Sequence, residues 1–150
     1  MNNTHTFTSH KLTSEDQPWV VDLLSKANLP TNDVDLDVQR FIKIESNGKN
    51  IAIGALEIAG NSALLRSVVV PQNLQRKGAG IAVTKALINE AKKLKLDNLF
   101  LLTETAEKFF DKIGFMTIDR KEVPEEILSL EEFTNICPST AACMTLKLNN

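Results

Sequence analysis

Segment 62–96 constrains the fold more than any other part of the chain, because a strand, a glycine loop and a helix follow one another in it. The apolar run SALLRSVVV, residues 62–70, is typical of a strand that is buried on both faces. The basic sequence QRKGAG then occupies residues 75–80. Residues 81–96 follow with an apolar helical stripe, formed by Val83, Leu87, Ala91 and Leu94. A helix start offers unpaired N–H groups and a positive dipole end, so the sequence predicts an anion-binding loop here.

Two phosphate-binding patterns do not fit this loop. A dinucleotide-binding GxGxxG pattern needs a third glycine where Val83 stands. A P-loop needs a lysine and a hydroxyl residue after the second glycine, where Ile81 and Ala82 stand. The six residues alone also fit an ordinary strand-to-helix turn with a solvated Arg76–Lys77 pair, and this alternative stays open at this point.

The rest of the chain alternates between strand-like and helix-like stretches. Asn47-Gly48 is a strong signal for a type I′ hairpin, and it separates residues 41–45 from residues 50–59. Gly60-Asn61 provides the next turn. We expect further strands at 4–12, 98–104 and 143–148, and helices at 14–29, 33–41, 106–114 and 124–137. The pattern predicts an α/β fold in which helices cover the faces of a mixed sheet.

Composition narrows the class of protein. With 150 residues, of which 43% are hydrophobic, the chain has the size of a single domain, 1–150. Its net charge of -2 provides no basic surface for nucleic acid. The N-terminus is polar and no apolar run approaches the roughly 18 residues of a membrane span, so we expect a cytoplasmic protein without a membrane partner. Cys137 and Cys143 fit neither redox nor zinc spacing, and no metal site is expected.

Two motifs together resemble one known family. Gln75, Gly78 and Gly80 follow a valine-rich strand and match the coenzyme A pyrophosphate loop of the GNAT superfamily of acyl-CoA N-acyltransferases. Downstream, AEKFFDKIGF at 106–115 is similar to a second superfamily motif, Ala-x-x-Phe-Tyr-x-Lys-x-Gly-Phe. The stretches LLRS, LLTETAEKFFDKIGF, R..VP and F.N.CPSTA further resemble N-acetyltransferases associated with arsenic-resistance operons.

The resemblance implies a fold and a co-substrate. The sheet would have six to seven strands, mostly antiparallel, and would splay at its central strands. Acetyl-CoA would bind with its pantetheine arm along the backbone of residues 68–70 and its diphosphate on the loop. Many members carry a tyrosine acid where Phe110 stands, so Phe110 would only pack beside the thioester. The implied coenzyme-binding residues are Val68, Val69, Val70, Gln75, Arg76, Lys77, Gly78, Ala79, Gly80 and Phe110.

The acceptor side rests on two charged residues on consecutive strands. Glu57 is the candidate general base, and a solvated strand carboxylate is its plainer interpretation. Arg66 lies in an apolar strand, so it must pair with a carboxylate, either Glu57 or that of an acidic substrate. We expect the two side chains to share a face across the Gly60-Asn61 turn. A closed internal salt bridge without a cavity beside it would contradict both assignments.

Three hydroxyl residues and one more arginine are weaker candidates. Ser67 would point to the face opposite Arg66 if the strand is regular. Thr103 and Thr105 follow the next strand, where they could bind substrate or cap the following helix. Arg120 could clamp a carboxylate, although its acidic neighbours favour a surface cluster.

Three functional classes remain. The first is a small-molecule N-acetyltransferase whose acceptor is an amine of the amino-acid type. The second is a protein N-terminal acetyltransferase, and the third is a coenzyme-binding regulatory module without catalysis. An α-amine with a pKa of roughly 7.7–8.0 needs less catalytic help than a lysine amine near 10.4, which favours α-amino acceptors. A homodimer is left open.

Overall fold

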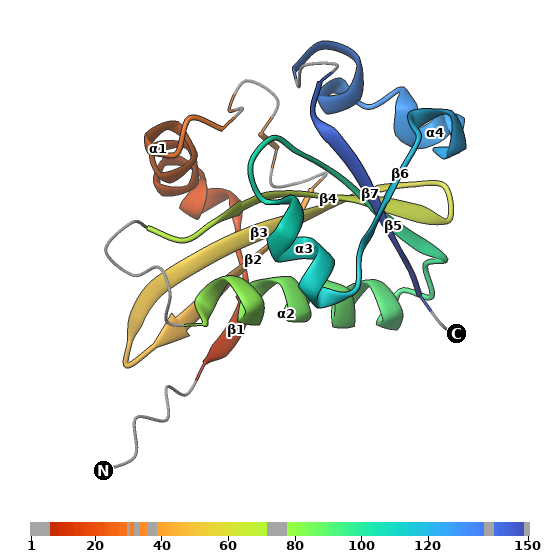
Figure 1. Ribbon diagram of the computed structural model, residues 1–150. Helices are drawn as coiled ribbons and strands as arrows, with labels where there is room; N and C mark the ends of the chain where they lie inside the picture. Colours follow the sequence, from red (N-terminus) through yellow and green to blue (C-terminus); the bar gives the residue numbers. More distant parts are fainter. Residues whose placement is uncertain are drawn as a thin grey trace. The chain divides into compact units, whose positions relative to one another are not determined.

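The computed structural model describes residues 7–29, 31, 34–35, 39–71, 78–136 and 140–148. Figure 1 shows the strands and helices in chain order. The strands are β1 (Thr8–Lys11), β2 (Arg40–Ser46), β3 (Lys49–Ala59), β4 (Ser62–Val69), β5 (Asn98–Thr103), β6 (Met116–Ile118) and β7 (Ala142–Lys147). The helices are η1 (Ser14–Asp16), α1 (Gln17–Lys26), α2 (Ala79–Lys93), α3 (Glu107–Ile113), η3 (Arg120–Glu122), α4 (Glu125–Leu128) and the π-helix η4 (Glu132–Ile136).

The strands form one seven-stranded sheet in the order β1-β2-β3-β4-β5-β7-β6. Strand β4 pairs with β5 in parallel, whereas the pairs β1–β2, β5–β7 and β6–β7 are antiparallel. The sheet confirms the predicted α/β fold with a mixed, mostly antiparallel sheet flanked by helices. The hairpin between β2 and β3 is also confirmed, because Asn47 and Gly48 both have the positive φ that a type I′ turn requires.

The chain divides into two compact units. The first consists of Met1–Ala55 and Ser67–Leu87, and the second of Leu56–Arg66 and Ile88–Asn150. Strands β3 and β4 and helix α2 contribute residues to both units. Each unit has its own cluster of buried apolar side chains. A single domain over residues 1–150 stays a prediction.

In the first unit, β3 is buried on both faces because a helix packs on each. Val20 and Leu24 of α1 are one helical turn apart, and they share a buried cluster with Ile53 and other strand residues. On the opposite face, a Cβ atom at Gly54 would lie 2.7 Å from Leu87 Cδ1 of α2. The absence of a side chain at Gly54 therefore lets α2 approach the strand closely.

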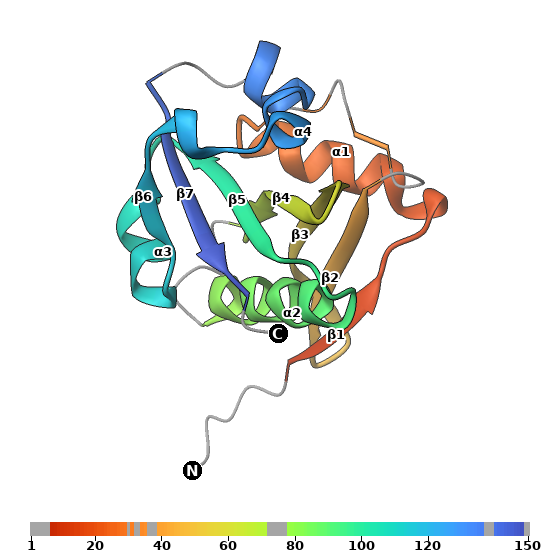
Figure 2. The ribbon, with the colours of Figure 1, turned by 90° about the vertical axis from the view of Figure 1, so that its right-hand side faces the viewer.

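In the second unit, β5 pairs along its whole length with β7, from Asn98–Lys147 to Thr103–Ala142. Figure 2 shows these two strands side by side, with β6 next to β7. Their core is a cluster of Leu64, Phe100, Val123, Ile127, Phe133 and Cys143.

The single helix predicted for 124–137 is wrong, because α4 ends at Leu128 and a π-helix begins at Glu132. Ile127 and Phe133 both belong to the buried cluster. Six residues of α-helix rotate by 240° at 100° per residue, so an unbroken helix would place these two side chains on different faces. The break lets both residues bury their side chains.

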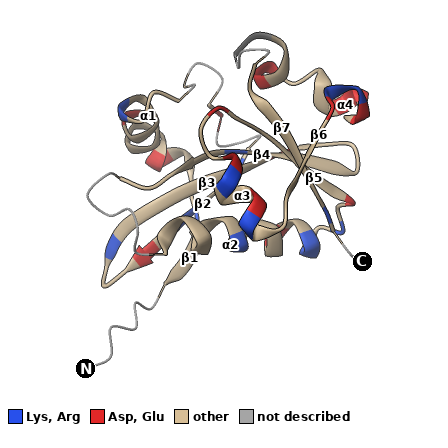
Figure 3. Cartoon of the chain, in the orientation of Figure 1, with Lys and Arg blue, Asp and Glu red and all other residues tan. Residues whose placement is uncertain are grey.

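Several predicted boundaries also move. Helix α2 begins at Ala79 rather than at 81 and ends at Lys93. The helix expected at 33–41 falls partly outside the described residues, and its last two residues belong to β2. Acidic and basic side chains are interspersed over the described elements (Figure 3). Among the described helices, none is long and apolar enough to cross a membrane.

Candidate active site

The predicted coenzyme loop leads into a well-formed helix in the first unit. Gly78 has a φ of 85°, a conformation that favours glycine, and its carbonyl accepts a hydrogen bond from the Ala82 amide at 3.0 Å. The following α2 helix has 15 residues. Its first-turn amides, at Ala79 and Gly80, have no partner within the helix and can bind an anion. Gln75, Arg76 and Lys77 lie outside the described residues.

The Phe7 side chain lies near this helix start, although sequence analysis did not select it. A Cβ atom at Gly78 would lie 3.8 Å from Phe7 Cε2. Phe7 is separated from Gly78 by most of the first unit in sequence, so local patterns gave no signal for this contact.

The end of β4 carries the residues expected to face the pantetheine arm. Ser67 has a φ of 59°, so β4 is not a regular strand at this position, and the condition on which the expected direction of Ser67 depended is not met. After Ser67, Val68 Cγ2 lies beside Gly54, and Val69 belongs to the cluster around α1. Val70 directly follows the strand and is half-buried.

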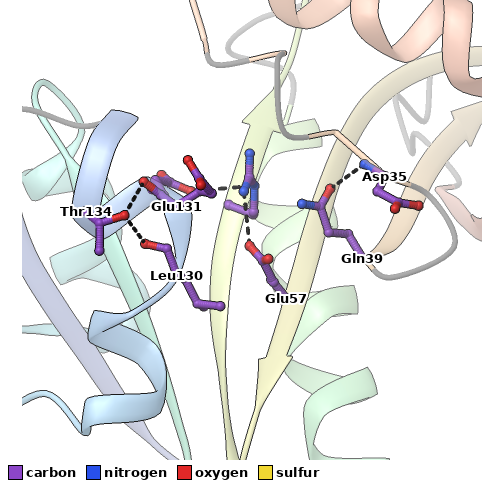
Figure 4. Close-up of polar contacts among 8 residues, drawn as sticks. Asp35, Gln39, Glu57, Leu130, Glu131 and Thr134 are labelled. Carbon is purple, nitrogen blue, oxygen red and sulfur yellow. Dashed lines mark hydrogen bonds and ion pairs between the residues drawn. The ribbon is translucent and has the colours of Figure 1, made fainter.

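The acceptor-side residues form an ion-pair cluster in the second unit (Figure 4). Arg66 Nη1 donates a hydrogen bond to Glu57 Oε1 at 3.1 Å, and Arg66 Nε lies 3.5 Å from Glu132 Oε2. The side chain of Arg66 is 1% exposed, that of Glu132 is 9% exposed and that of Glu57 is 13% exposed. The predicted shared face of Glu57 and Arg66 is confirmed, and of the two partners considered for Arg66, the internal carboxylate is present. The internal salt bridge that would count against both assignments is therefore present, and the roles of Glu57 as base and of Arg66 as carboxylate clamp stay predictions.

The cluster contains two carboxylates for one guanidinium. Burial makes an unpaired charge expensive, so the arginine within β4 is stabilised by acids from two other elements, β3 and η4. Sequence analysis found Glu57 through its short distance along the β3–β4 hairpin. It missed Glu132, because several acidic residues follow β5 and nothing in the local pattern distinguishes this one.

The remaining candidates in the second unit differ in exposure and in their contacts. Thr103 Oγ1 accepts a hydrogen bond from the Ala106 amide at 3.0 Å, just before α3. The N-cap residue of α3 is Ala106 and no side chain caps this helix, so Thr103 does not take the capping role considered for it. Thr105 is exposed. Phe110 is buried and makes edge-to-face contacts with Phe109 and Phe115, at centroid distances of 5.1 and 5.6 Å. The packing role of Phe110 needs no polar group.

Arg120 is partly buried, and Cys143 is buried. Arg120 Nη2 donates to the Ala141 carbonyl at 3.2 Å, and its guanidinium lies 5.8 Å from the centre of the Phe133 ring. The carboxylate clamp and the surface cluster considered for Arg120 both stay predictions. Cys143 is a buried free thiol, whereas Cys137 lies outside the described residues. Burial raises the pKa of the Cys143 thiol, Arg120 opposes this effect, and Asp119 adds to it.

Several solved structures share this fold. N-acetylglutamate synthase from Neisseria gonorrhoeae, complexed with coenzyme A and L-arginine, matches with a TM-score of 0.81 at 18% identity. That match covers 98% of this chain and 34% of the synthase, so the chain spans about a third of the synthase's length. Mycobacterium tuberculosis Rv2747, in complex with coenzyme A, matches with a TM-score of 0.78 at 21% identity, over 95% of this chain and 99% of that one. The ribosomal-protein-S18-alanine N-acetyltransferase from Escherichia coli matches with a TM-score of 0.72 at 19% identity, over 97% and 96% of the two chains.

The sequence itself matches a family as well. Residues 19–131 match the acetyltransferase (GNAT) domain family, and this range contains both motifs on which the resemblance was based. The match spans β2 to α4 and includes the β4–α2 unit and the Glu57–Arg66 pair. The chain therefore belongs to the GNAT family and carries its acyl-CoA-dependent N-acetyltransferase domain.

Proposed function

We propose that the protein transfers the acetyl group of acetyl-CoA to the amine of a small, amino-acid-like acceptor. The observation that carries this proposal is the carboxylate of Glu57, which remains partly exposed while the buried Arg66 holds it at 3.1 Å. A carboxylate fixed in this way is suited to accept a proton from an amine. Among the described residues, Arg66 engages Glu57 through Oε1, so Oε2 is left for the amine.

The reaction needs one proton acceptor and little help for the leaving group. The amine nitrogen forms a bond to the acetyl carbon, the carbon–sulfur bond breaks, and the amine proton passes to Glu57 directly or through water. The coenzyme leaves as a thiolate, whose reference pKa is about 8.5, so it can depart without a tyrosine acid. The absence of tyrosine from this chain therefore does not prevent transfer. Positioning and electrostatic polarisation supply the remaining rate enhancement.

On the coenzyme side, the diphosphate binds to the amides at the start of α2, and the pantetheine arm follows the end of β4. The first contact uses residues 75–80, and the second uses residues 68–70. Phe110 packs beside the thioester. Support comes from the positive φ of Gly78 directly before a long helix, and from the match of this segment to the GNAT family.

On the acceptor side, Glu57 binds the amine. The hydroxyl residues proposed to contact the substrate are Ser67, Thr103 and Thr105. Arg66 is the candidate partner for an acceptor carboxylate. Arg66 already pairs with the carboxylates of Glu57 and Glu132. To bind Arg66, the substrate carboxylate therefore has to replace one of these two partners. An acceptor without a carboxylate would not require such exchange.

A panel of acceptors tests the proposal. Release of the coenzyme A thiol is measured with free amino acids and with short peptides that differ in their N-terminal residue. We expect turnover with free amino acids, and Glu57→Gln should lower kcat by an effect that fades as the pH rises past the amine pKa. Glu104→Gln, at an exposed carboxylate, is the matched control.

Two other results of the panel would indicate a different function. Turnover with peptides alone would indicate a protein N-terminal acetyltransferase. This alternative is retained because the chain shares its fold with the E. coli S18-alanine enzyme. Tight acetyl-CoA binding without turnover of any acceptor would indicate a regulatory module.

The narrower resemblance has a separate test. If the chain acts in arsenic resistance, as its LLRS and CPSTA stretches led us to expect, its expression in a sensitive host should raise the arsenic concentration that the cells tolerate. Glu57→Gln should remove that effect. The cytoplasmic location and the homodimer stay predictions, to be tested by fractionation and by light scattering.

A further inference from the structure

We propose that Glu132 is a positioning residue for the reaction: by sharing the guanidinium of Arg66, it holds the carboxylate of Glu57 in place and controls how readily Glu57 takes up a proton. The catalytic consequence rests on the proposed function. The coupling between the two carboxylates does not, because it can be measured without turnover.

The two contacts use different nitrogen atoms of one rigid group. Glu57 Oε1 lies 3.1 Å from Arg66 Nη1, and Glu132 Oε2 lies 3.5 Å from Arg66 Nε. Guanidinium is planar, and its five N–H donors point in fixed directions. The Glu57 contact is a hydrogen bond, whereas the Glu132 Oε2 contact with Arg66 Nε is an ion pair without a hydrogen bond. Glu132 therefore acts on the guanidinium mainly through its charge, at a position separate from that of Glu57.

The cluster is buried enough for charge to matter. The side chain of Arg66 is almost inaccessible to solvent, and both carboxylates are largely covered. In such surroundings, charges interact more strongly than they do in water, and dissolved salt screens them less. One guanidinium faces two carboxylates, so the attraction that either acid receives depends on whether the other acid is charged.

The chain holds Glu132 firmly at this place. Phe133, the next residue, belongs to the buried cluster that also contains Ile127. Thr134 Oγ1 donates to the carbonyls of Leu130 and Glu131, at 3.3 and 3.4 Å, which ties the π-helix back to the preceding turn (Figure 4). The break between α4 and η4 therefore presents Glu132 to Arg66 from a fixed backbone.

The described elements β3, β4, α4 and η3 also carry charged residues. Glu57 is on β3 and Arg66 on β4. The side chain of Glu126, on α4, lies beside Gly60, where a Cβ atom would be 3.5 Å from Glu126 Cγ. Arg120, on η3, faces the ring of Phe133. Neither contact places Glu126 or Arg120 on the guanidinium, so Glu132 is the acid expected to change the behaviour of Glu57 most.

The proposal predicts a change of defined sign in Glu132→Gln. Glutamine keeps the size and one oxygen acceptor but removes a negative charge beside the guanidinium. Arg66 then attracts Glu57 without competition, and Glu57 should be protonated only at lower pH. We expect the midpoint measured for Glu57 to be lower in Glu132→Gln than in the wild type. As a weaker base, Glu57 should also support a lower kcat, with the KM for acetyl-CoA unchanged.

The first arm of the test uses no substrate. Carbon-13 NMR of the glutamate carboxyl groups gives the titration midpoint of Glu57 in the wild type, in Glu132→Gln and in Glu132→Asp. Glu125→Gln, an exposed acid on α4, controls for the loss of one charge from this part of the chain. We expect a downward shift in Glu132→Gln, no shift in Glu125→Gln, and a return toward the wild-type midpoint in Glu132→Asp. An unchanged midpoint in folded Glu132→Gln, or an equal shift in Glu125→Gln, overturns the proposal.

The second arm uses the acceptor from the panel. The acidic limb of the pH profile of kcat/KM should move to lower pH in Glu132→Gln, whereas a merely structural role would lower activity at all pH values without moving the limb. If the NMR shift is present but no acceptor is turned over by the wild type, the proposed function fails and the coupling stands. If turnover is normal and neither limb nor midpoint moves, the coupling fails and the proposed function stands.

Discussion

Arg66 has one partner that the sequence predicts and a second that only the folded structure reveals. Its place in an apolar strand indicates that a carboxylate must be nearby, because an unpaired buried cation is costly. The hairpin turn then makes Glu57 the natural partner, and the structure confirms it at 3.1 Å. The second acid, Glu132, comes from a segment 66 positions later in the chain. Only chain folding brings it to the same guanidinium.

We predict that Arg66→Met strongly destabilises the fold. The substitution keeps an unbranched apolar side chain in β4 but leaves two largely buried carboxylates without their cation. The free energy of unfolding, measured with urea, should fall by about 3–5 kcal/mol.

The same variant with Glu57→Gln and Glu132→Gln provides the control. Neutral amides remove the uncompensated charge, so the triple variant should regain much of the lost stability. Equal losses in the single and triple variants would mean that packing, and not charge, dominates at this position.

Cys143 should make stability depend on pH in the alkaline range. Burial raises the pKa of its thiol above the ordinary value of 9.0, so above pH 9 the unfolded chain loses this proton while the folded chain keeps it. The free energy of unfolding should therefore decrease as the pH rises from 9 toward the folded-state pKa, by up to about 1.4 kcal/mol per pH unit from this group. Below pH 9 the group contributes no slope.

Cys143→Ala isolates this effect, because other groups titrate in the same range. Urea unfolding of both proteins between pH 8 and pH 10.5 should give curves that converge as the pH rises, since only the wild type loses the contribution of a buried neutral thiol. Parallel curves would show that Cys143 does not change its protonation on unfolding.

At the scale of elements, the packing of α2 on the sheet depends on the absence of one side chain. Val83 and Leu87 of α2 are fully buried, and a Cβ atom at Gly54 would lie 3.3 Å from Val83 Cγ2 and 2.7 Å from Leu87 Cδ1. The sequence predicts this stripe of α2 from its period but not the strand position that it covers. Gly54 therefore fixes the distance between β3 and α2.

We predict that Gly54→Ala destabilises the protein, although alanine is otherwise the better strand residue. The added methyl group overpacks the contact, and the free energy of unfolding should fall by about 1–3 kcal/mol. Leu87→Val removes the nearest atom, so in the double variant Gly54→Ala should have a smaller effect than in the wild type. Additive effects of the two substitutions would argue against a direct contact.

In the segment after η3, the hydrophobic pattern predicts one helix, but the structure has two, α4 and η4. Residues 124–137 have enough apolar residues for one helix, yet Ile127 and Phe133 can reach the same cluster only because α4 ends and η4 begins between them. The Ser129 hydroxyl donates to the Glu126 carbonyl at 3.0 Å, a local bond that competes with helix continuation. Tertiary burial decides the break, and the break places Glu132.

At the scale of the whole molecule, binding of acetyl-CoA should be visible as a gain in stability. A ligand that binds only the folded protein, at 100 times its dissociation constant, adds about 2.7 kcal/mol. For a chain of this size, we expect the Tm to rise by roughly 5–10 °C in differential scanning calorimetry.

Gly80→Val should abolish most of this rise, because a β-branched side chain in the first turn of α2 blocks close approach of the diphosphate to the backbone. Asn89→Val introduces the same side chain at an exposed position of α2 and should keep the full rise. A full rise in Gly80→Val would show that acetyl-CoA does not use this helix start.

The sequence by itself determined the features that depend on neighbours along the chain. The hairpin at Asn47-Gly48, the buried strand 62–70 and the helix after the glycine loop all follow from local conformational preference and hydrophobic period. The pairing of Glu57 with Arg66 follows from a short turn between adjacent strands. These predictions succeeded because the physical cause lies within about ten residues.

Only the tertiary structure decided the features that depend on distant segments. The left-handed conformation of Ser67 interrupts the regular strand on which the expected alternation depended, and a serine carries no local requirement for that conformation. Arg120 contacts the Ala141 carbonyl and the ring of Phe133, which sequence analysis did not predict. Glu132 reaches the ion-pair cluster of Arg66 because the burial of Ile127 and Phe133 requires the chain to break between α4 and η4. The contacts of Arg120 and Glu132 join residues that lie far apart in sequence, and burial of such residues follows no local pattern.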